Sequence, residues 1–487
     1  MENRCGKCQK KRHNGKNGGK KSKKNCHCRK KCSEDATPLI MIDDFTNFDG
    51  FIATILLQKA KNIDLRLLVA SKGFSQIGPG INNLFNMLSW FGNNKTKVVP
   101  GSYFADQEVE AGPNPTFGAT PPSERTGQLA QPIFQMFVPP LWQDNASTLY
   151  GTVGQIPLNK NPDRQYLSVA PTPGNPFIPA RDHIAEVLGQ VRLEGKRAII
   201  FNTGPLTDLA KFFEAYGNAY NDSIEEVVIM GGGFFNFANP DDSTSQRWAG
   251  NIFSDQAFPL SPVFGNLTPP PGYDYNPGDW EVKPPFHTMQ EFNVFLDPAA
   301  AQAVFDHLYN NNIRTRVIPT DATDPLLIAN GLDALQDSPT PEGRYVSDLL
   351  YNLRLFEGGA FDFVIRLWDI IAALAILNPE VIDESQSIKA KISVHQLDDI
   401  EALKRVACDN PLKNPYNVMT YDPYVGQTTL VEDPNSSITV VRRVNRELAL
   451  QAIIDRLNSQ VNSACRPANY YINRNAGSSC GSKGQNK

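Results

Sequence analysis

The sequence predicts an α/β fold with an open, mostly parallel central sheet and helices on both of its faces. Two observations support this prediction. Short apolar runs of strand length alternate with longer segments whose apolar residues have helical spacing. Several of the apolar runs end in aspartate or glycine, as strands do where they lead into the loops at the carboxyl edge of a parallel sheet.

The expected elements begin at Pro38. A strand over PLIMIDD (38–44) precedes a helix over FIATILLQKA (51–60) and a second strand over LRLLVAS (65–71). The alternation then continues through RAIIFNTG (197–204), PLTDLAKFFEAY (205–216), EEVVIMGGG (225–233), AAAQAVFDHLY (299–309) and RTRVIPTDAT (314–323). Finally, DFVIRLWDIIAALAIL (362–377) predicts a loop that leads into an apolar helix. Ligands of such sheets bind beyond the carboxyl ends of the strands, so a site is expected in the loops that follow them.

One domain is expected over residues 38–460, between a basic, cysteine-rich tail (1–37) and a flexible, cysteine-containing tail (461–487). Two stretches interrupt the alternation, at about 104–180 and 238–288, and both are rich in proline and contain aromatic residues. Long loops of this kind are usually functional or disordered. Their aromatic content favours lids or assembly surfaces.

The N-terminal tail is strongly basic although the whole chain has a net charge of -4. Its first 32 residues contain ten Lys and three Arg against one Glu. Such a segment repels itself and lacks apolar periodicity, so disorder is expected, with binding to nucleic acid or another polyanion as one role and simple solubilisation as the other. Seven of the eight cysteines lie in the two tails, where zinc binding, disulfide cross-linking and free thiols all stay open.

The sequence contains no apolar run long enough for a membrane span, and no apolar segment follows the basic N-terminus as it would in a secretory signal peptide. A cytoplasmic location without membrane contact is therefore favoured. The cysteine-rich tails would instead suit an oxidised particle or a spore-like surface.

Oxygen-bearing residues accumulate where the expected strands end. Asp43, Asp44 and Asp49 follow the first strand, Thr203 follows RAIIF, and Asp369 opens the late helix. If these residues converge, they need a positive charge between them, and oxygen ligands suit Ca²⁺ or Mg²⁺. The alternative is that each aspartate caps the helix that follows it.

Five segments in order carry a family resemblance: NTGPLTDLA (202–210), VVIMGGG (227–233), QEFNVFLDPAAAQAVF (290–305), WDIIAALAILNPEVI (368–382) and GQTTLVEDPNSSITVVRRVNRELALQAIIDRL (426–457). Together they resemble the inosine–uridine-type nucleoside hydrolases over about residues 38–459, apart from the two insertions. The resemblance implies Ca²⁺-dependent hydrolysis of the N-glycosidic bond of ribonucleosides to base and ribose. It also implies a homo-oligomer.

The resemblance assigns roles to individual residues. It implies Asp44, Asp49, Asp369 and the backbone carbonyl of Thr203 as Ca²⁺ ligands, with Asp44 also activating the attacking water. It implies a substrate-binding set made of Asp43, Met230, Glu291, Asn293 and Trp368. The transition state of this reaction resembles an oxocarbenium ion, so nearby carboxylates stabilise it while the metal holds the ribose hydroxyls and acidifies water.

The first motif departs from the family pattern D-x-D-x-x-x-D-D, because this chain has IDDFTNFDG. Aligned by the helix IATILL, Asp43 is the first family acid, Phe45 falls on the metal-binding base and Gly50 falls on the last acid. A shift by one residue gives Asp44 and Asp49 the two metal-ligand positions. Both alignments stay open.

Two further departures concern the base and the ribose. Trp368 replaces a histidine that often protonates a purine, and Phe74 replaces a ribose-binding asparagine. Trp368 either stacks on a nucleobase or covers the start of its helix. The alternative function is thus a catalytically inactive protein of this fold with a structural or binding role, its tails cross-linked by disulfides or bound to a polyanion.

Overall fold

The computed structural model describes residues 36–45, 48–71, 178–234, 291–323, 332–357, 367–395 and 426–459, together with parts of 81–101. All eight cysteines, Phe74 and nearly all of the two tails and the two proline-rich insertions lie outside the described residues. The predictions made for those segments therefore stay predictions.

The core of the molecule is a nine-stranded sheet with the order β3-β2-β1-β4-β5-β6-β9-β7-β8. Its strands are β1 (Thr37–Asp43), β2 (Ile63–Ala70), β3 (Lys97–Pro100), β4 (Ala198–Asn202), β5 (Ile224–Met230), β6 (Thr315–Ile318), β7 (Ile388–Val394), β8 (Thr428–Glu432) and β9 (Ile438–Val440). Pairing is parallel from β3 through to β9, and β7 is antiparallel to both β9 and β8. The predicted mostly parallel sheet is confirmed.

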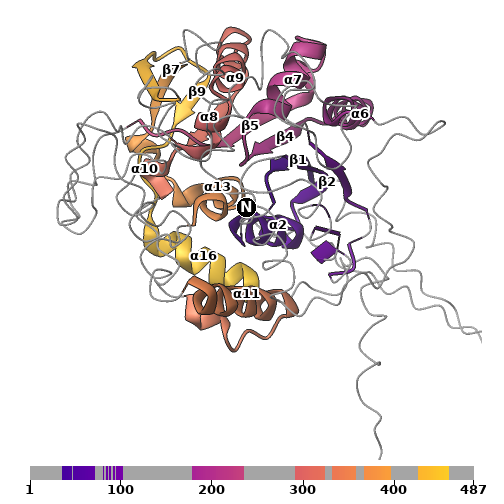
Figure 1. Ribbon diagram of the computed structural model, residues 1–487, viewed down its shortest axis with the longest axis vertical. Helices are drawn as coiled ribbons and strands as arrows, with labels where there is room; N and C mark the ends of the chain where they lie inside the picture. The colour runs from indigo at the N-terminus through magenta and orange to yellow at the C-terminus, as the bar shows by residue number, and fades with distance from the viewer. Residues whose placement is uncertain are drawn as a thin grey trace, which may run out of the picture.

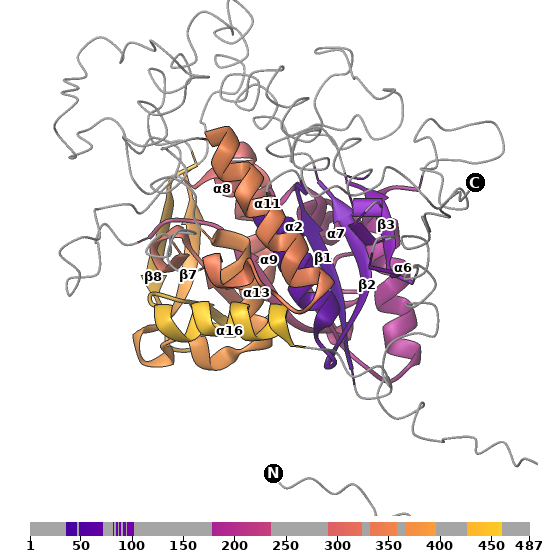
Figure 2. The same ribbon diagram turned by 90° about the horizontal axis from the view of Figure 1, so that it is seen from below.

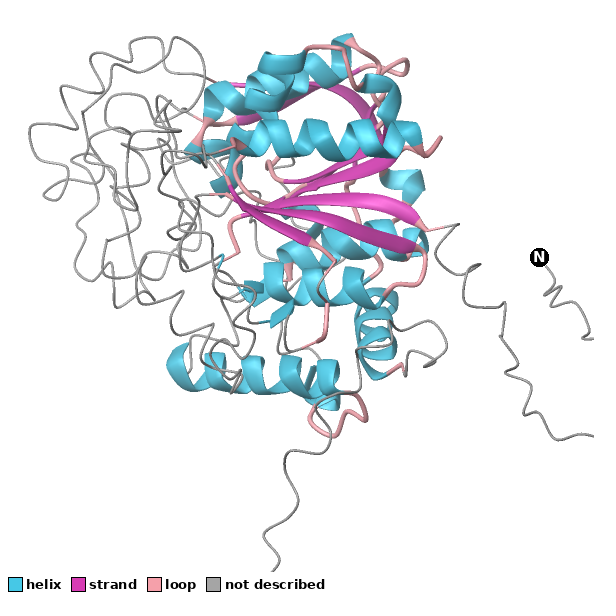
Figure 3. Cartoon of the chain, turned by 90° about the vertical axis from the view of Figure 1, so that its right-hand side faces the viewer, coloured by secondary structure: helices cyan, strands magenta, loops and turns pink. Residues whose placement is uncertain are grey.

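Helices cover both faces of this sheet, as predicted (Figures 1 and 3). The α-helices are α2 (Phe48–Lys59), α6 (Ala180–Leu193), α7 (Thr207–Tyr216), α8 (Phe292–Leu296), α9 (Pro298–Asn310), α10 (Thr320–Thr323), α11 (Pro341–Glu357), α13 (Trp368–Leu377) and α16 (Arg446–Asn458). Four short 3₁₀ helices are η2 (Asn221–Ser223), η3 (Leu332–Leu335), η5 (Pro379–Val381) and η6 (Glu384–Gln386). Figure 1 shows α6, α7 and α9 on one side of the sheet and α2, α13, α16 and α11 on the other.

Two apolar layers separate the sheet from its helices. In β1, Leu39 and Met41 pack towards α2 and α13, whereas Ile40 and Ile42 pack towards α6 and α7. All four side chains are buried, because a parallel strand in the middle of a covered sheet has no solvent-facing side. This explains why the first strand is continuously apolar up to its terminal acids.

Strand order reverses at β1, which has β2 on one side and β4 on the other. The chain therefore leaves β1 and β4 in opposite directions, which opens a crevice at their carboxyl ends. The residues that follow these two strands include Asp44 and Thr203, so the topology brings together two of the predicted site segments.

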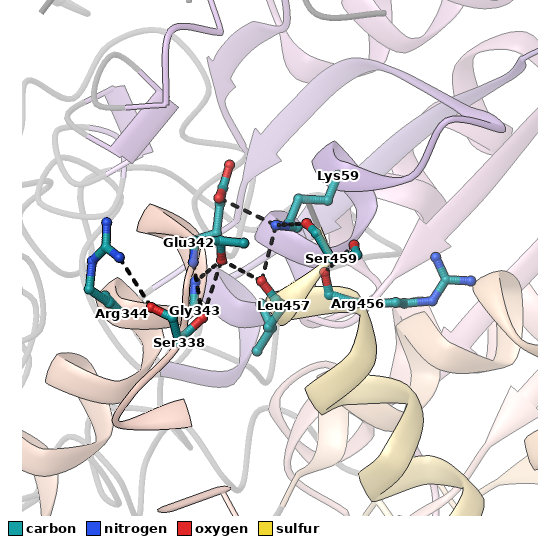
Figure 4. Close-up of polar contacts among 9 residues, drawn as sticks. Lys59, Ser338, Glu342, Gly343, Arg344, Arg456, Leu457 and Ser459 are labelled. Atoms are coloured by element: carbon teal, nitrogen blue, oxygen red, sulfur yellow. Dashed lines mark hydrogen bonds and ion pairs between the residues drawn. The ribbon is translucent and has the colours of Figure 1, made fainter. Parts of the chain in front are cut away.

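A buried lysine joins three helices on the α2 side of the sheet (Figure 4). Lys59 ends α2, and its Nζ lies 3.3 Å from Oε2 of Glu342 in α11. The same Nζ donates hydrogen bonds to the carbonyls of Leu457 and Ser459 at the end of α16, at 3.1 and 3.2 Å. Figure 2 shows α11 and α16 together with α2 on this side. The ammonium group thus stabilises the carboxyl ends of α2 and α16.

Several elements lie outside the sequence-based expectation. The helix expected from residue 51 begins at Phe48, and the sequence did not indicate β3, α6 or α11. In the part of the chain that the structure describes, no helix combines the length and the hydropathy needed to cross a membrane.

Candidate functional site

The candidate site begins where β1 and β4 end side by side. Asp43 is the last residue of β1, and its carbonyl accepts a hydrogen bond from the amide of Ser71 at 2.8 Å. The amide of Thr203, just after β4, donates to the carbonyl of Ile42 at 2.8 Å. A Cβ on Gly204 would lie 3.0 Å from the Asp44 nitrogen and 3.2 Å from the Asp43 Cα, so glycine here lets the segment after β4 lie close to the end of β1.

Five carboxylates gather at this edge, and all are buried: Asp43, Asp44, Asp49, Glu291 and Asp369. Asp49 lies in the first turn of α2 and Asp369 in the first turn of α13. The backbone amide of Asp369 lies 3.4 Å from Oδ2 of Asp49, and the amide of Gly50 donates to its Oδ1 at 3.1 Å. The amino-terminal ends of these two packed helices therefore present positive partial charge to the carboxylates.

The carboxylates repel one another strongly. Burial, reinforced by the charges of Asp44 and Asp49, raises the pKa of Asp43 well above its usual range. Burial raises the pKa of Asp49 to about 7, and Asp44 acts in the same direction. The pKa of Asp369 is also raised well above its usual range, first by burial and then by the neighbouring aspartates. Such a group is stable only if protons or a cation reduce its negative charge.

Glu291 is held rigidly at the start of α8. Its carboxylate caps this helix by accepting hydrogen bonds from the amides of Asn293 and Val294 at 2.9 and 3.1 Å. It also accepts from the amide of Gly232 at 3.1 Å. Burial raises the pKa of Glu291 to about 7, and the charge of Asp44 contributes to the rise. Glu291 therefore lies within electrostatic reach of Asp44.

Asn293 connects α8 to the ends of two strands. Its side-chain amide donates to the carbonyl of Thr203 at 2.8 Å, and Nδ2 lies 3.4 Å from the carbonyl of Met230. The predicted ribose-binding residue thus contacts the carbonyl that was predicted to bind metal. A carbonyl oxygen has two lone pairs, so this hydrogen bond leaves one of them for another donor or a cation.

Met230 and Trp368 occupy different environments. Met230 ends β5, is buried, and has its sulfur 3.7 Å from Nδ2 of Asn293, at the edge of the site. Trp368 is the first residue of α13 and is partly buried against the apolar cluster that α2 and α13 share. The covering role considered for Trp368 accounts for this packing, and stacking on a base stays a prediction.

The two unusual positions of the first motif, Phe45 and Gly50, contribute no oxygen. The Phe45 side chain is fully buried in the same apolar cluster, with its ring centroid 6.4 Å from that of Phe51. A Cβ on Gly50 would collide with Oδ2 of Asp43 and would lie 3.5 Å from Oδ2 of Asp369. Asp43 and Asp369 therefore approach each other across Gly50.

The residues match a hard divalent cation in donor chemistry, because every candidate donor is an oxygen atom. The buried Asp43 carboxylate lies beside the buried Thr203, and hydrogen bonding from Thr203 opposes the rise in the pKa of Asp43. Within the described ranges, however, no group of three or more His, Cys, Asp or Glu side chains is arranged to hold a metal ion. Three of these carboxylates would therefore have to move closer together to hold one cation.

One pair at the neighbouring strand end escaped the sequence-based interpretation. Ser71, directly after β2, donates a hydrogen bond from its hydroxyl to Oδ2 of Asp208 at 2.5 Å, and both residues are buried. Asp208 lies in the first turn of α7, within the segment GPLTDLA. Two features of the sequence could have indicated this pair. Ser71 is a polar residue at the end of an apolar strand, and Asp208 is an acid in the helix that follows a second strand, β4.

Comparison with known proteins identifies the family. Residues 40–451 match the family described as inosine-uridine preferring nucleoside hydrolase. Nucleoside hydrolase 4 of Arabidopsis thaliana is 26% identical over 301 residues, which cover 60% of this chain and 44% of that protein. The chain thus aligns with less than half the length of this curated relative.

Solved structures agree with the fold. A purine-preferring ribonucleoside hydrolase from Gardnerella vaginalis has a TM-score of 0.54 at 17% identity, covering 87% of this chain and 98% of that one. An inosine-uridine preferring nucleoside hydrolase from Bacillus anthracis has a TM-score of 0.53 at 16% identity, covering 87% and 99%. With a family match that extends over most of its length, the chain belongs to the inosine-uridine preferring nucleoside hydrolase family.

Proposed function

We propose that the chain hydrolyses the N-glycosidic bond of a ribonucleoside to base and ribose, with Ca²⁺ as the cofactor. The observation that carries the proposal is the convergence of five buried carboxylates at the carboxyl ends of β1 and β4. Members of the family depend on a metal ion, and calcium suits a site of carboxylate and carbonyl oxygens.

The residues proposed to hold the cation are Asp44, Asp49, Asp369 and the carbonyl of Thr203. A bound calcium ion would orient ribose hydroxyls and lower the pKa of water at the site. Asp44 is the proposed base. Its charge contributes to the raised pKa of each of the other four carboxylates, so it lies near all of them.

Glu291 and Asn293 are proposed to bind the ribose. Three backbone amides hold the Glu291 carboxylate in place, and a carboxylate has further lone pairs with which to accept from a sugar hydroxyl. The amide of Asn293 is used by the Thr203 carbonyl, so its side-chain oxygen is the atom proposed to accept from ribose. Positive charge that develops on the ribose is stabilised by the surrounding carboxylates, whose positions are set before the reaction.

A second function, ribonucleoside binding without cleavage, is favoured by the first motif. Position 45 supplies a core phenylalanine and position 50 supplies no side chain, so the oxygen donors are fewer than the family pattern provides. In this case the role of the chain would be structural or binding. The proposed cross-linking of the tails or their contact with a polyanion would then contribute to function.

Sugar release from a panel of purine and pyrimidine ribonucleosides separates the two functions. The full chain is assayed with calcium, with chelator, and as the Asp369→Asn variant, using Glu447→Gln on the exposed side of α16 as the matched control. Hydrolysis requires release that chelator and Asp369→Asn abolish and that Glu447→Gln leaves intact. Calorimetric binding of a ribonucleoside without release supports the second function, and the absence of both binding and release contradicts both.

A further inference from the structure

We propose that two adjacent residues at the start of α7, Thr207 and Asp208, brace the site by holding two of its parts at a fixed separation. One part is the ribose-binding segment with Glu291 and Asn293, and the other is the acidic end of β1 at Asp43. Thr207 and Asp208 are positioning residues, because each acts on the site through another side chain. The inference rests on the ribonucleoside binding of the proposed function.

Thr207 is tied to the ribose-binding segment. Its hydroxyl donates a hydrogen bond to Oδ2 of Asp297 over 2.6 Å, and both residues are buried. Asp297 lies between α8 and α9, where its other carboxylate oxygen caps α9 by accepting from the amide of Ala300 at 3.1 Å. Because α8 has only five residues, a shift of Asp297 at its end should be transmitted to Glu291 at its start.

Asp208 is tied to the acidic end of β1 through Ser71. The Ser71 hydroxyl donates to Oδ2 of Asp208 over 2.5 Å, and the Ser71 amide donates to the carbonyl of Asp43 at 2.8 Å. All three residues are buried. Ser71 thus connects the first turn of α7 to the residue with which β1 ends.

The space around the Asp208 carboxylate is restricted, as a positioning role requires. A Cβ on Gly101, directly after β3, would collide with Oδ2 of Asp208 and would lie 2.8 Å from Cα of Ser71. The Gly101 amide donates to the carbonyl of Ala70 at 2.7 Å, so this glycine is itself held in place. The carboxylate is therefore enclosed by the ends of β2 and β3, although its helix follows β4 on the other side of β1.

The two hydroxyl–carboxylate hydrogen bonds are well suited to fixing positions. At 2.5 and 2.6 Å they are of the short, charge-assisted kind, which is roughly twice as strong as a bond between neutral groups. Both are buried, where an unmade hydrogen bond is costly. Because Thr207 and Asp208 are consecutive in one helix, the helix backbone sets the separation of their partners, Asp297 and Ser71. Releasing either partner should change how the site presents its oxygens to a ribonucleoside.

Inosine and uridine are the probes for the test, with calcium supplied to the full chain. The readout is Kd from calorimetry, or kcat/KM if the chain hydrolyses the probe. Thr207→Val removes the hydroxyl but keeps the shape of the side chain, so affinity should fall by at least about tenfold, and Thr207→Ser should restore it to within about twofold. Asp208→Asn, which keeps an acceptor for Ser71, should weaken affinity less than Asp208→Ala does.

Thr96→Val is the matched control for a purely structural effect. The buried Thr96 hydroxyl donates to the carbonyl of Leu65 at 2.8 Å, near the amino-terminal ends of β2 and β3 and away from the site. This variant should lose stability as Thr207→Val does and yet bind both probes as the unaltered chain does. Thermal unfolding measures the stabilities and identifies any variant that fails to fold.

Hydrogen exchange measured by mass spectrometry provides a readout that needs no ligand. Thr207→Val should accelerate exchange in α8, Ser71→Ala should accelerate it at the end of β1, and Thr96→Val should change neither segment. Unchanged affinity in folded Thr207→Val, or a loss that Thr207→Ser does not restore, would overturn the inference. If the unaltered chain binds neither probe, the proposed function is refuted, and exchange in the two segments alone then decides whether the brace exists.

Discussion

The side-chain amide of Asn293 donates a hydrogen bond to the backbone carbonyl of Thr203 over 2.8 Å, inside the buried edge of the sheet. Asn293 belongs to α8, whose start Glu291 caps, and Thr203 follows β4. The proposed ribose-binding segment and the proposed cation-binding segment are thus in direct contact. A change in one of them should therefore be detected in the other.

Asn293→Asp should lower the free energy of unfolding by about 1–3 kcal/mol, because a buried carbonyl loses its donor and faces an additional acceptor. Urea unfolding of the calcium-free protein measures the change. The matched control is Asn435→Asp, at an exposed position, where a change within about 0.5 kcal/mol is expected. Equal effects of the two substitutions would show that the hydrogen bond to Thr203 does not stabilise the fold.

Lys59→Met should be strongly destabilising, because it removes a cation that pairs with the buried carboxylate of Glu342 (Figure 4). The side chains of Lys59 and Glu342 are 5% and 2% exposed, and breaking one side of a buried pair costs about 3–5 kcal/mol. Denaturant unfolding should show that adding Glu342→Gln to Lys59→Met recovers part of this loss. Lys97→Met serves as the control, since its ion pair with Glu186 is exposed and should contribute less than about 1 kcal/mol.

Gly50→Ala should destabilise the calcium-free protein by about 1–3 kcal/mol, because the added methyl group overlaps the Asp43 carboxylate in a packed interior. Gly189→Ala in α6 is the matched control, because its nearest contact is 3.9 Å away and alanine favours the helix by about 0.5–1 kcal/mol. Thermal unfolding should therefore move in opposite directions for the two variants. Removing the obstructing carboxylate with Asp43→Ala should relieve the effect of Gly50→Ala, and a lack of relief would argue against this contact.

The calcium-free protein should lose stability as the pH rises towards neutrality. Burial raises the pKa of Asp49 and of Glu291 to about 7 in the folded state, whereas both groups ionise near their ordinary values in the unfolded chain. Between the unfolded pKa values and about pH 7, the folded state therefore binds more protons than the unfolded state. The free energy of unfolding is greatest below the unfolded pKa values and decreases as the pH rises to about 7. Glu291→Gln should reduce the slope.

The measurement is chemical unfolding between pH 4 and pH 9, in chelator and in excess calcium. Because a cation competes with protons for carboxylates, the stabilisation by calcium should grow as the pH rises over the same interval. Stability that increases from pH 4 to pH 7 in chelator would contradict the assigned pKa directions. Calcium stabilisation that is independent of pH would argue that the ion binds elsewhere.

The fold was largely predictable from local pattern. Apolar runs such as IMID and AIIFN have the length and composition of strands buried on both faces, and the helical spacing of ATILLQK places α2 between β1 and β2. Segments with weaker patterns were not predicted. β3 has only four residues, and α6 begins at the boundary of a proline-rich stretch.

The positions of the site residues were only partly predictable. The carboxyl ends of parallel strands meet at one edge, so the order of the elements favoured a convergence of Asp43, Asp44, Asp49 and Asp369 without establishing it. Their individual orientations did not follow. A shift of one residue within the turn after β1 changes no apolar pattern, so both alignments of IDDFTNFDG were compatible with the sequence.

By itself, therefore, the sequence determined the sheet, its covering helices, the family and the edge at which a site forms, because these depend on periodicity and on the order of motifs. Only the tertiary structure decided that Phe45 packs in the core, that Asp43 lies over Gly50 opposite Asp369, and that Asn293 holds the Thr203 carbonyl. These contacts join segments far apart in the chain. Their geometry depends on packing between β1, α2, α8 and α13, which no local pattern of residues encodes.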